Sequence, residues 1–421
     1  MYVGVTPPIG DGWQQDEDTL DTWFSSGTWT FSTLGWPKET PDLKQYHPTA
    51  WMQMGYELLF FWMARMIMMS TYALDQIPFR EVYFHGMLRD TEGKKFSKSL
   101  GNGIDPMDIV RRYGADSLRL SLIAGISPGS DSKFYTEKIQ GYRNFINKLW
   151  NISRFILTSV EQPKLIEELP VLSGDIDYWI WYEYTGLVTE VTNLLNEKMF
   201  SLAAEKLYDF TWSKFADWYL ELAKIENRIK PETKKDRDGL LLYLLQNLLK
   251  LWHPFIPFVT EVIWGQVNKD KLLMIEQWPE EASVTGNRGS VTGAAEEMKK
   301  LQEIVTVLRN ARAENKVAAA TISQVQYIGQ PKIDSLKPFI ETLGRVKLVD
   351  QVESKLELKG SWFRLITDIQ GVEKSVDQTE LKKYIADLEA KLADSNFTSR
   401  APRKVVDEVK KKLADARVKL E

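Results

Sequence analysis

Hydrophobic residues in the first quarter of the chain follow two different patterns. Residues 55–70 (GYELLFFWMARMIMMS) are mostly apolar and contain no proline, and Leu58 and Trp62 are spaced to share one face of a helix. Residues 81–88 (EVYFHGML) form a short apolar run that contains strand-favouring residues. The two patterns predict a helix followed by a buried strand.

A lysine-rich loop follows the predicted strand. Residues 94–104 (KKFSKSLGNGI) contain lysines, serines and glycines, and Asp105 and Pro106 come directly after them. Aspartate is favoured at the N-cap of a helix, and proline is favoured in its first turn. A strand, a glycine-bearing loop and a helix in this order predict a βα unit of a parallel sheet.

The middle of the chain has a helical pattern. From about Phe134 to Trp264, long segments carry apolar residues at helical spacing, and polar loops such as KPETKKDRDG separate them. The segments are YRNFINKLWNISRFIL, YWIWYEYTGLVTEVTNLLNE, SLAAEKLYDFTWSKFADWYLELAKI and LLLYLLQNLLKLWHPFIPFVTEVIW. They predict an up-and-down helical bundle.

The pattern changes again after the bundle. Residues 283–293 (SVTGNRGSVTG) have the composition of a linker. Beyond them, a helical pattern over residues 296–315 precedes two strand-like runs, 321–329 and 345–352, with a helical segment between the runs. This order predicts a small α/β domain.

The end of the chain has a heptad pattern. Apolar residues alternate between spacings of three and four on both sides of NFTSRAP, a segment that contains a proline. These residues are Leu381, Ile385, Leu388 and Leu392, then Val406, Val409, Leu413, Ala416 and Leu420. The pattern predicts an antiparallel helical hairpin, and by itself it suits a packed or self-associating helix pair.

Composition excludes several kinds of site. The chain has no cysteine, and its 3 histidines are far apart in the sequence. Thiolate metal sites and metal-spaced histidine pairs are therefore absent, and we predict no metal site built from protein ligands. No segment has the pattern of a signal peptide or a membrane span, so we expect a cytoplasmic protein.

Charge is distributed unevenly along the chain. The formal net charge is −4, but residues 381–421 contain 11 Lys and Arg against 7 Asp and Glu, a net charge of +4 (11 − 7). The remaining residues therefore carry −8 (−4 − 4). The end of the chain is mildly basic on an otherwise acidic protein.

The lysine-rich loop suits the binding of a polyphosphate. Glycines let a loop move and approach a ligand closely, and ammonium groups stabilise negative charge that develops on phosphates. Ligands of parallel sheets sit at the carboxyl ends of the strands, where this loop lies. A solvated basic turn is the alternative, because short motifs often occur without a function.

A longer similarity favours phosphate binding. Residues 95–99 (KFSKS) resemble the KMSKS signature of the class I aminoacyl-tRNA synthetases, and the similarity extends through HGMLRDTEGKKFSKSLGNGIDPMDIVRRYGADSLRL. Within this class, LDTWFSSGTWTFSTLGWP (residues 20–37) and GYELLFFWMARM (residues 55–66) resemble the valyl-tRNA synthetases. The likeness covers essentially the whole chain in order.

The resemblance implies a site for ATP, bound with Mg²⁺. In the family the signature loop contacts the ATP phosphates, which implies catalytic roles for Lys95 and Lys98. Phe96, which replaces the usual Met, and Ser97 and Ser99 would shape the same ATP-binding loop. Loop motion and charge stabilisation would thus come from one short segment.

Four further residues match ATP-binding positions of the family. Gly55 and Glu57 match a Gly-x-Asp element near the adenylate ribose, where glutamate keeps the carboxylate but adds a methylene. His85 and Gly86 would lie near the adenine. For His85 alone, a structural role at the end of a strand is the alternative.

The resemblance also implies a pocket for valine. Trp23, Leu58 and Trp62 match the family positions that form bulky walls and close the cavity to larger side chains. Ordinary core packing is the alternative, since the chain has 15 tryptophans. A hydrophobic pocket rejects threonine only ~100-fold, and the family therefore adds an editing domain.

Two parts of the family are not found in this chain. One is the editing domain, and the other is the His-Ile-Gly-His signature, which binds ATP from the side opposite the lysine loop. We therefore expect the C-terminal portion of a valyl-tRNA synthetase, which does not activate valine unaided. A separate N-terminal half that carries the missing signature is a candidate partner.

The resulting fold class is multidomain and mainly α. We expect the second half of a Rossmann-like α/β catalytic domain over residues 1–133 and an α-helical anticodon-binding bundle over residues 134–282. A small α/β connecting domain would follow over residues 294–372, and an antiparallel coiled-coil arm over residues 376–421.

The expected function is that of a valine–tRNA ligase, which uses ATP to activate valine and transfers it to tRNA(Val), acting as a monomer. Arg400, Arg403 and Lys404 lie near the turn of the predicted arm and would contact tRNA phosphates. A related isoleucyl or leucyl enzyme is one alternative, although Trp23 and Trp62 would crowd a larger amino acid. A non-catalytic tRNA-binding protein derived from a synthetase is the other.

Overall fold

The computed structural model describes residues 1–97, 100–160, 163–280, 288–318, 320–330, 333–354, 356–369 and 378–393, together with 406, 409, 410 and 413. The chain divides into two compact units. The first comprises Met1–Val171, Ile180–Trp218 and Lys235–Ser283, and the second comprises Leu172–Trp179, Tyr219–Lys234 and Val284–Glu421. The described residues are mainly helical with small sheets, as the sequence predicted.

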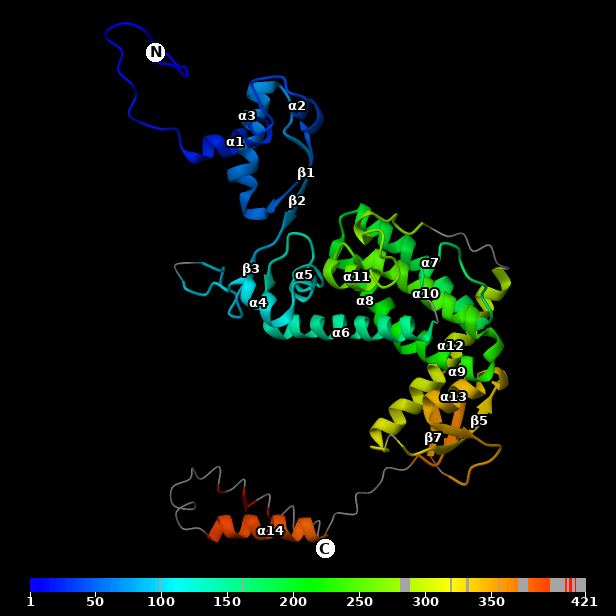
Figure 1. The fold of residues 1–421 in the computed structure, drawn as a ribbon. Helices are drawn as coiled ribbons and strands as arrows, with labels where there is room; N and C mark the ends of the chain where they lie inside the picture. Colours follow the sequence, from blue (N-terminus) through cyan, green and yellow to red (C-terminus); the bar gives the residue numbers. More distant parts are fainter. Residues whose placement is uncertain are drawn as a thin grey trace. The chain divides into compact units, whose positions relative to one another are not determined.

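The first unit contains a two-stranded parallel sheet near its start. Strand β1 (Thr49–Gly55) pairs with β2 (Phe79–His85), and α3 (Ala64–Leu74) connects them (Figure 1). A 3-10 turn (Tyr56–Leu58) and a π-helical turn (Leu59–Met63) lead into α3. The predicted helix and strand are therefore present. The sequence pattern missed β1, because its buried positions are two methionines and a glycine, which are not strong strand formers.

Helix α3 packs against this sheet through Met66. Helix α1 (Thr22–Ser32) packs against α3, and the short α2 (Pro41–Tyr46) lies between α1 and β1 in sequence. Met52 and Met54 of β1 form a buried cluster with Met66 of α3, and Leu58 and Trp62 pack against its edge. The α1–α3 contact and this cluster hold the end of the sheet in place.

A second pair of parallel strands follows in the chain. Strand β3 (Leu88–Arg89) pairs with β4 (Ser132–Lys133), and between them lie α4 (Pro106–Tyr113) and α5 (Ala115–Ile123). The Asp105 carboxylate accepts a hydrogen bond of 2.9 Å from the Met107 amide. The helix start predicted at Asp105 and Pro106 is thereby confirmed.

The rest of the first unit is helical, as predicted for this stretch. Its helices are α6 (Thr136–Ser159), α7 (Asp175–Asn196), whose first turn belongs to the second unit, α8 (Phe200–Asp209), a π-helical run (Phe210–Tyr219), α10 (Lys234–Trp252) and α11 (Pro257–Trp264). A 3-10 turn (Leu273–Ile275) follows. Trp181, Trp252 and Trp264 are buried among these helices. Figure 1 shows α6 extending from the α4–α5 pair along the other helices.

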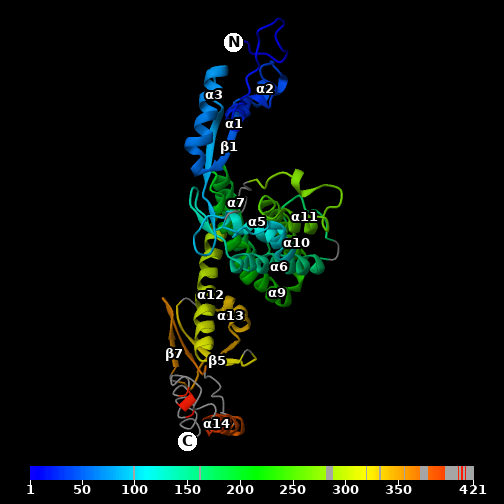
Figure 2. The same ribbon diagram turned by 90° about the vertical axis from the view of Figure 1, so that its left-hand side faces the viewer.

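The second unit contains a four-stranded sheet. Its strands are β5 (Ser323–Gly329), β6 (Val346–Leu348), β7 (Leu356–Lys359) and β8 (Phe363–Thr367), in the order β6-β5-β8-β7. β5 is parallel to β6 and antiparallel to β8, and β7 is antiparallel to β8. Figure 2 shows α12 (Arg288–Glu314) and α13 (Lys337–Gly344) beside this sheet. The unit also contains helix α9 (Leu220–Ile229), 3-10 turns at Pro231–Thr233 and Asp334–Leu336, and a further helix near the end of the chain.

Helix α12 corrects the predicted linker. Residues 288–293 lie in the helix, although their glycines and serines suggested a flexible segment. Ala294, Met298 and Leu301 follow at helical spacing and are buried. Packing of this apolar face explains why the helix extends into a sequence of low helical propensity.

The arm predicted at the end of the chain is described only in part. Helix α14 (Gln378–Ala393) is present, and Ile385 and Leu388 are buried, as is Val406 of the second predicted helix. The turn of the predicted hairpin lies outside the described residues. The coiled coil and the four predicted domain boundaries stay predictions.

Polar contacts fix α5 against the start of α11 within the first unit. The buried Asp116 carboxylate accepts hydrogen bonds from the amides of Phe258 (3.2 Å) and Val259 (2.7 Å). Arg119 donates to the carbonyl oxygens of Pro254 (3.1 Å) and Phe255 (3.2 Å). These contacts join the α/β segment to the helices that follow it.

His253 lies beside this contact. Its Nδ1 is 2.9 Å from Thr260 Oγ1. Burial lowers the pKa of His253, and the nearby carboxylates of Glu261 and Asp116 partly oppose the shift. The folded protein therefore favours the neutral imidazole.

This burial predicts a loss of stability in mild acid. The unfolded chain takes up a proton as the pH falls below the usual histidine pKa of about 6.5, while folded His253 resists protonation. The contribution is therefore present above that pH and is lost as the pH falls toward the lowered folded-state pKa. We expect His253→Gln to reduce the change in urea midpoint between about pH 7.5 and about pH 5.5. The exposed-histidine variant His85→Gln is the control, and an unchanged pH dependence in His253→Gln would contradict the prediction.

Candidate nucleotide site and family membership

Predicted ATP-binding residues meet at the carboxyl ends of β1 and β2. Gly55 and His85 are register partners at these ends. Just beyond the strands, Glu57 Oε1 lies 3.8 Å from Lys95 Nζ. The parallel pairing therefore brings together residues of the glycine-glutamate element, the strand end and the lysine loop.

Asp90 and Asn102 hold the base of the lysine loop. Asp90 Oδ1 accepts hydrogen bonds from the amides of Glu92 (3.0 Å) and Lys94 (2.8 Å). Asn102 donates to Asp90 Oδ2 (2.8 Å) and accepts from the Ser97 amide (2.9 Å). The hydrogen bond from Asn102 is the largest cause that lowers the pKa of the Asp90 carboxyl, ahead of the Lys94 amide. Both ends of the loop are thus joined through one side-chain pair.

A second carboxylate fixes the chain after β2. Asp131 Oδ1 accepts a hydrogen bond of 2.7 Å from the Met87 amide, and Oδ2 accepts one from Arg89. These contacts, with the Met87 amide first, lower the pKa of the Asp131 carboxyl. They keep the strand end close to residues 130–132.

Gly86 lies where two backbone segments come closest. A Cβ atom at this position would be 1.8 Å from the carbonyl oxygen of Ser130 and 2.6 Å from the Asp131 amide nitrogen. Only glycine fits between these segments without moving the backbone. The requirement for glycine is therefore steric, independently of any nucleotide.

A cavity of about 550 Å³ opens beside these residues. Gln53, His85, Gly86, Lys95 and Phe96 line one part of it. The rest is lined by further residues of β2, β3 and β4, by α5 and the segment that follows it, and by the start of α8. A cavity at the ends of parallel strands, with a lysine at its edge, is a suitable site for a nucleotide.

Three family models match successive parts of the chain. Residues 9–135 match tRNA synthetases class I (I, L, M and V), residues 177–327 match the anticodon-binding domain of tRNA ligase, and residues 372–421 match the valyl tRNA synthetase tRNA binding arm. The chain belongs to the valyl-tRNA synthetase family.

Curated relatives agree with this membership. The valine–tRNA ligase of Bacillus subtilis (strain 168) is 37% identical over 444 residues, which cover 99% of this chain and 49% of that protein. That of Oceanobacillus iheyensis is 36% identical over 443 residues, with coverages of 99% and 49%. The chain thus spans about half the length of the curated relatives it matches.

A solved structure shares the fold. The LeuRS of Agrobacterium radiobacter K84 (agnB2), in its ternary complex, superposes with a TM-score of 0.53 at 21% sequence identity, covering 66% of this chain and 34% of that one. At this identity the likeness concerns the fold alone.

Of the residues predicted for the valine pocket, Trp23 lies in α1, and Leu58 and Trp62 lie in the two turns that lead into α3. Trp62 Nε1 donates a hydrogen bond of 2.9 Å to the Ser26 carbonyl oxygen. The guanidinium of Arg65 lies 4.2 Å from the centre of the Trp23 ring, and Leu58 packs on the methionine cluster. None of the three predicted residues lines the cavity beside Lys95. Their role in the family's amino-acid pocket stays a prediction.

Some predicted residues lie outside the described part of the chain. These are Lys98 and Ser99 of the signature loop and Arg400, Arg403 and Lys404 of the arm. Of the remaining loop residues, Ser97 is held by Asn102, and Phe96 makes an edge contact with Phe134 at 6.2 Å.

Sequence reasoning did not single out the residues that position the loop. Asp90, Asn102 and Asp131 are ordinary polar residues in sequence, and only their contacts across the fold show their role. Asp90 and Asn102 fall within the segment that resembles the family, which was the one available signal.

Neither a metal cluster nor a membrane helix is found in the described ranges. In those ranges no group of at least 3 His, Cys, Asp or Glu could hold a metal ion. No helix among the same residues is long and apolar enough to cross a membrane.

The close contact at Gly86 predicts a strong local effect of an added methyl group. We expect Gly86→Ala to lower the free energy of unfolding by about 1–3 kcal/mol, because the backbone near Ser130 must move. Urea unfolding followed by tryptophan fluorescence measures the loss. Gly103→Ala is the control, since a Cβ there meets no atom within 4 Å. Equal stabilities of the two variants would show that the close contact is absent.

Proposed function

We propose that the chain supplies the lysine-loop side of a valine–tRNA ligase active site. That activity uses ATP to form valyl-adenylate and then transfers valine to tRNA(Val). The observation that carries the proposal is the meeting of Lys95, Glu57 and His85 at the carboxyl ends of β1 and β2. Family membership supports the same assignment.

In this proposal the cavity beside Lys95 takes the nucleotide. The Lys95 ammonium is mostly exposed, so it is free to leave Glu57 for the ATP phosphates. The Glu57 carboxylate would then accept hydrogen bonds from the ribose hydroxyls, and His85 and Gly86 would lie by the adenine. Lys98 joins Lys95 by the family pattern alone. Mg²⁺ would arrive bound to the ATP phosphates, which supply the oxygen ligands that it prefers.

The chemistry requires orientation and charge stabilisation rather than a protein nucleophile. The valine carboxylate attacks the α-phosphate, and pyrophosphate leaves with the charge that develops. Preorganised ammonium groups stabilise this charge in the transition state. Asp90 and Asn102 act as positioning residues, because they hold the loop that carries the lysines.

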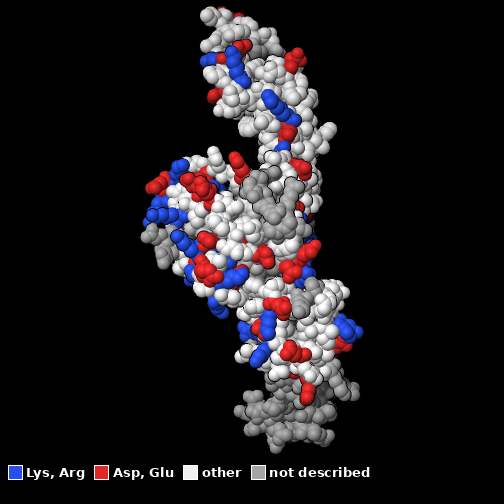
Figure 3. Space-filling model, turned by 90° about the vertical axis from the view of Figure 1, so that its right-hand side faces the viewer, with Lys and Arg blue, Asp and Glu red and all other residues white. Residues whose placement is uncertain are grey.

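An exposed apolar stripe supports a partner for this half-site. Phe60, Met68 and Tyr72 lie along the π-helical turn and α3, with exposures of 81%, 69% and 92%. Figure 3 shows the α1–α3 part of the first unit as mainly uncharged on the face drawn. Exposed apolar surface of this kind on a helix is typical of a site of interaction with another protein segment. We propose that a segment carrying the His-Ile-Gly-His signature covers this stripe and completes the site.

The decisive test of the function is valine-dependent ATP–pyrophosphate exchange. We expect no exchange from the purified chain alone and measurable exchange after addition of an N-terminal half from a related valyl-tRNA synthetase. Phe60→Asp, which places a charge on the apolar stripe, should abolish the gain by blocking association. Exchange by the chain alone would contradict the half-site proposal. Absence of exchange in both cases, with tRNA still bound, would favour a non-catalytic tRNA-binding protein.

The loop contacts predict a specific effect on ATP. Asn102→Ala removes hydrogen bonds to Asp90 and to the Ser97 amide, so the lysines are held less firmly. In the enzyme formed by the chain and the added N-terminal half, we expect the KM for ATP to rise about tenfold, which is the order of the effect of one lost hydrogen bond. The KM for valine should stay unchanged. Asn151→Ala, on the exposed face of α6, is the control. An equal effect on both substrates would indicate general unfolding instead.

A further inference from the structure

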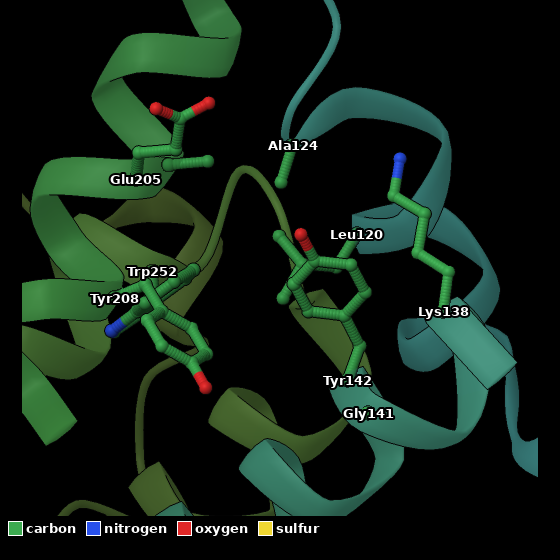
Figure 4. A pocket seen from close by; sticks show the side chains of 9 residues that line it. Leu120, Ala124, Lys138, Gly141, Tyr142, Glu205, Tyr208 and Trp252 are labelled. Carbon is green, nitrogen blue, oxygen red and sulfur yellow. The ribbon is translucent and has the colours of Figure 1, made fainter. Parts of the chain in front are cut away.

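A second cavity lies within the first unit, and none of the predicted site residues lines it. Its volume is about 360 Å³, and residues of α5, α6, α8 and α10 line it. Figure 4 shows Lys138 and Glu205 on opposite sides, with the Tyr142 ring between them. The cavity is large enough for a small organic molecule and combines apolar walls with polar ends.

The ammonium of Lys138 has no carboxylate partner in the described residues within ion-pair distance. The side chain is half-buried, and burial lowers the pKa of its ammonium, an effect that Glu205 partly opposes. A buried cation is costly unless an anion compensates it. The Lys138 side of the cavity therefore favours an anionic group.

Glu205 is fixed in place by one of its oxygens. Oε1 accepts hydrogen bonds from the Gly125 amide (3.1 Å) and the Ser201 hydroxyl (3.0 Å). Oε2 accepts none from the residues that the structure describes. A carboxylate oriented in this way is an acceptor for a donor group on a bound molecule.

Rings form much of the wall between these ends. Tyr142 and Tyr208 meet edge to face, with ring centres 6.4 Å apart, and Trp252 lies beside them. Leu120 and Ala124 complete an apolar surface. A flat aromatic body suits such walls because stacked and edge contacts bury its faces.

We propose that this cavity binds a small aromatic carboxylate that carries a hydrogen-bond donor at the end opposite its carboxylate. Lys138 binds the carboxylate, the rings of Tyr142, Tyr208 and Trp252 enclose the aromatic body, and Glu205 accepts the donor. The proposal does not rest on the proposed ligase function, since it concerns residues outside the nucleotide cavity.

Hydrogen bonds connect the two cavities. Ser201 lines the cavity beside Lys95 and donates to Glu205, which lines the second cavity. The Ser201 hydroxyl also accepts a hydrogen bond of 3.0 Å from the Ile126 amide, and Ile126 lines the cavity beside Lys95. A molecule that binds Glu205 would therefore affect the positions of Ser201 and Ile126, which line the cavity beside Lys95.

Isothermal titration of the full chain with three related probes tests the proposal. We expect 4-hydroxybenzoate to bind more tightly than benzoate, which lacks the donor, and than phenol, which lacks the carboxylate. Lys138→Met should weaken 4-hydroxybenzoate about tenfold or more, the order of one lost charge-assisted hydrogen bond, and should leave phenol binding unchanged. Unchanged phenol binding shows that the variant is folded.

Two further variants, one of them a control, test the proposed hydrogen bond between the ligand's donor group and Glu205. Glu205→Gln should weaken 4-hydroxybenzoate but not benzoate, because only the former presents a donor. Glu137→Gln changes an exposed carboxylate on α6 next to Lys138 in sequence, and it should leave all three affinities unchanged. Failure of 4-hydroxybenzoate to bind the wild-type chain, or equal binding by wild type and Lys138→Met, would overturn the proposal.

Discussion

Parallel pairing of β1 with β2 is the constraint on which the candidate nucleotide site depends. It places Gly55 opposite His85, so the segments that leave the two strands begin side by side. Glu57 follows one strand and Lys95 follows the other, and their charged atoms come within 3.8 Å. An exposed ion pair of this kind contributes little to stability. Its importance is positional, because it marks the point where the two segments meet, next to the cavity that Lys95 lines.

The lysine loop combines a fixed base with exposed charges. Asp90 and Asn102 join the beginning and end of the loop, while the Lys95 side chain stays mostly exposed. Phosphoryl chemistry of the family's kind needs cations that are correctly oriented and still able to follow the moving charge. Gly86 and Asp131 also help to position the loop. They hold the chain after β2 against residues 130–132.

Local sequence patterns predicted most of the helices and strands. They could not predict contacts between residues that are distant in sequence. The start of α4 at Asp105 and Pro106 was predictable because an N-cap is a property of adjacent residues. Strand β1 was not, since its methionines have no strong strand preference, and the start of α12 was hidden by linker-like composition. The nucleotide residues came from the resemblance to a known signature. Asp90, Asn102 and Asp131 could not be found in this way, because their function arises from partners up to 44 residues away, as between Asp131 and Met87.

Protection of Lys95 by ATP tests the central claim most directly. The rate of lysine acetylation is measured by mass spectrometry with and without saturating ATP, and exposed Lys164, far from the site in sequence, serves as the internal reference. Binding of nucleotide in the cavity at the ends of β1 and β2 predicts slower acetylation of Lys95 and an unchanged rate at Lys164. Equal rates at Lys95 with and without ATP would contradict the assignment of this cavity to the nucleotide.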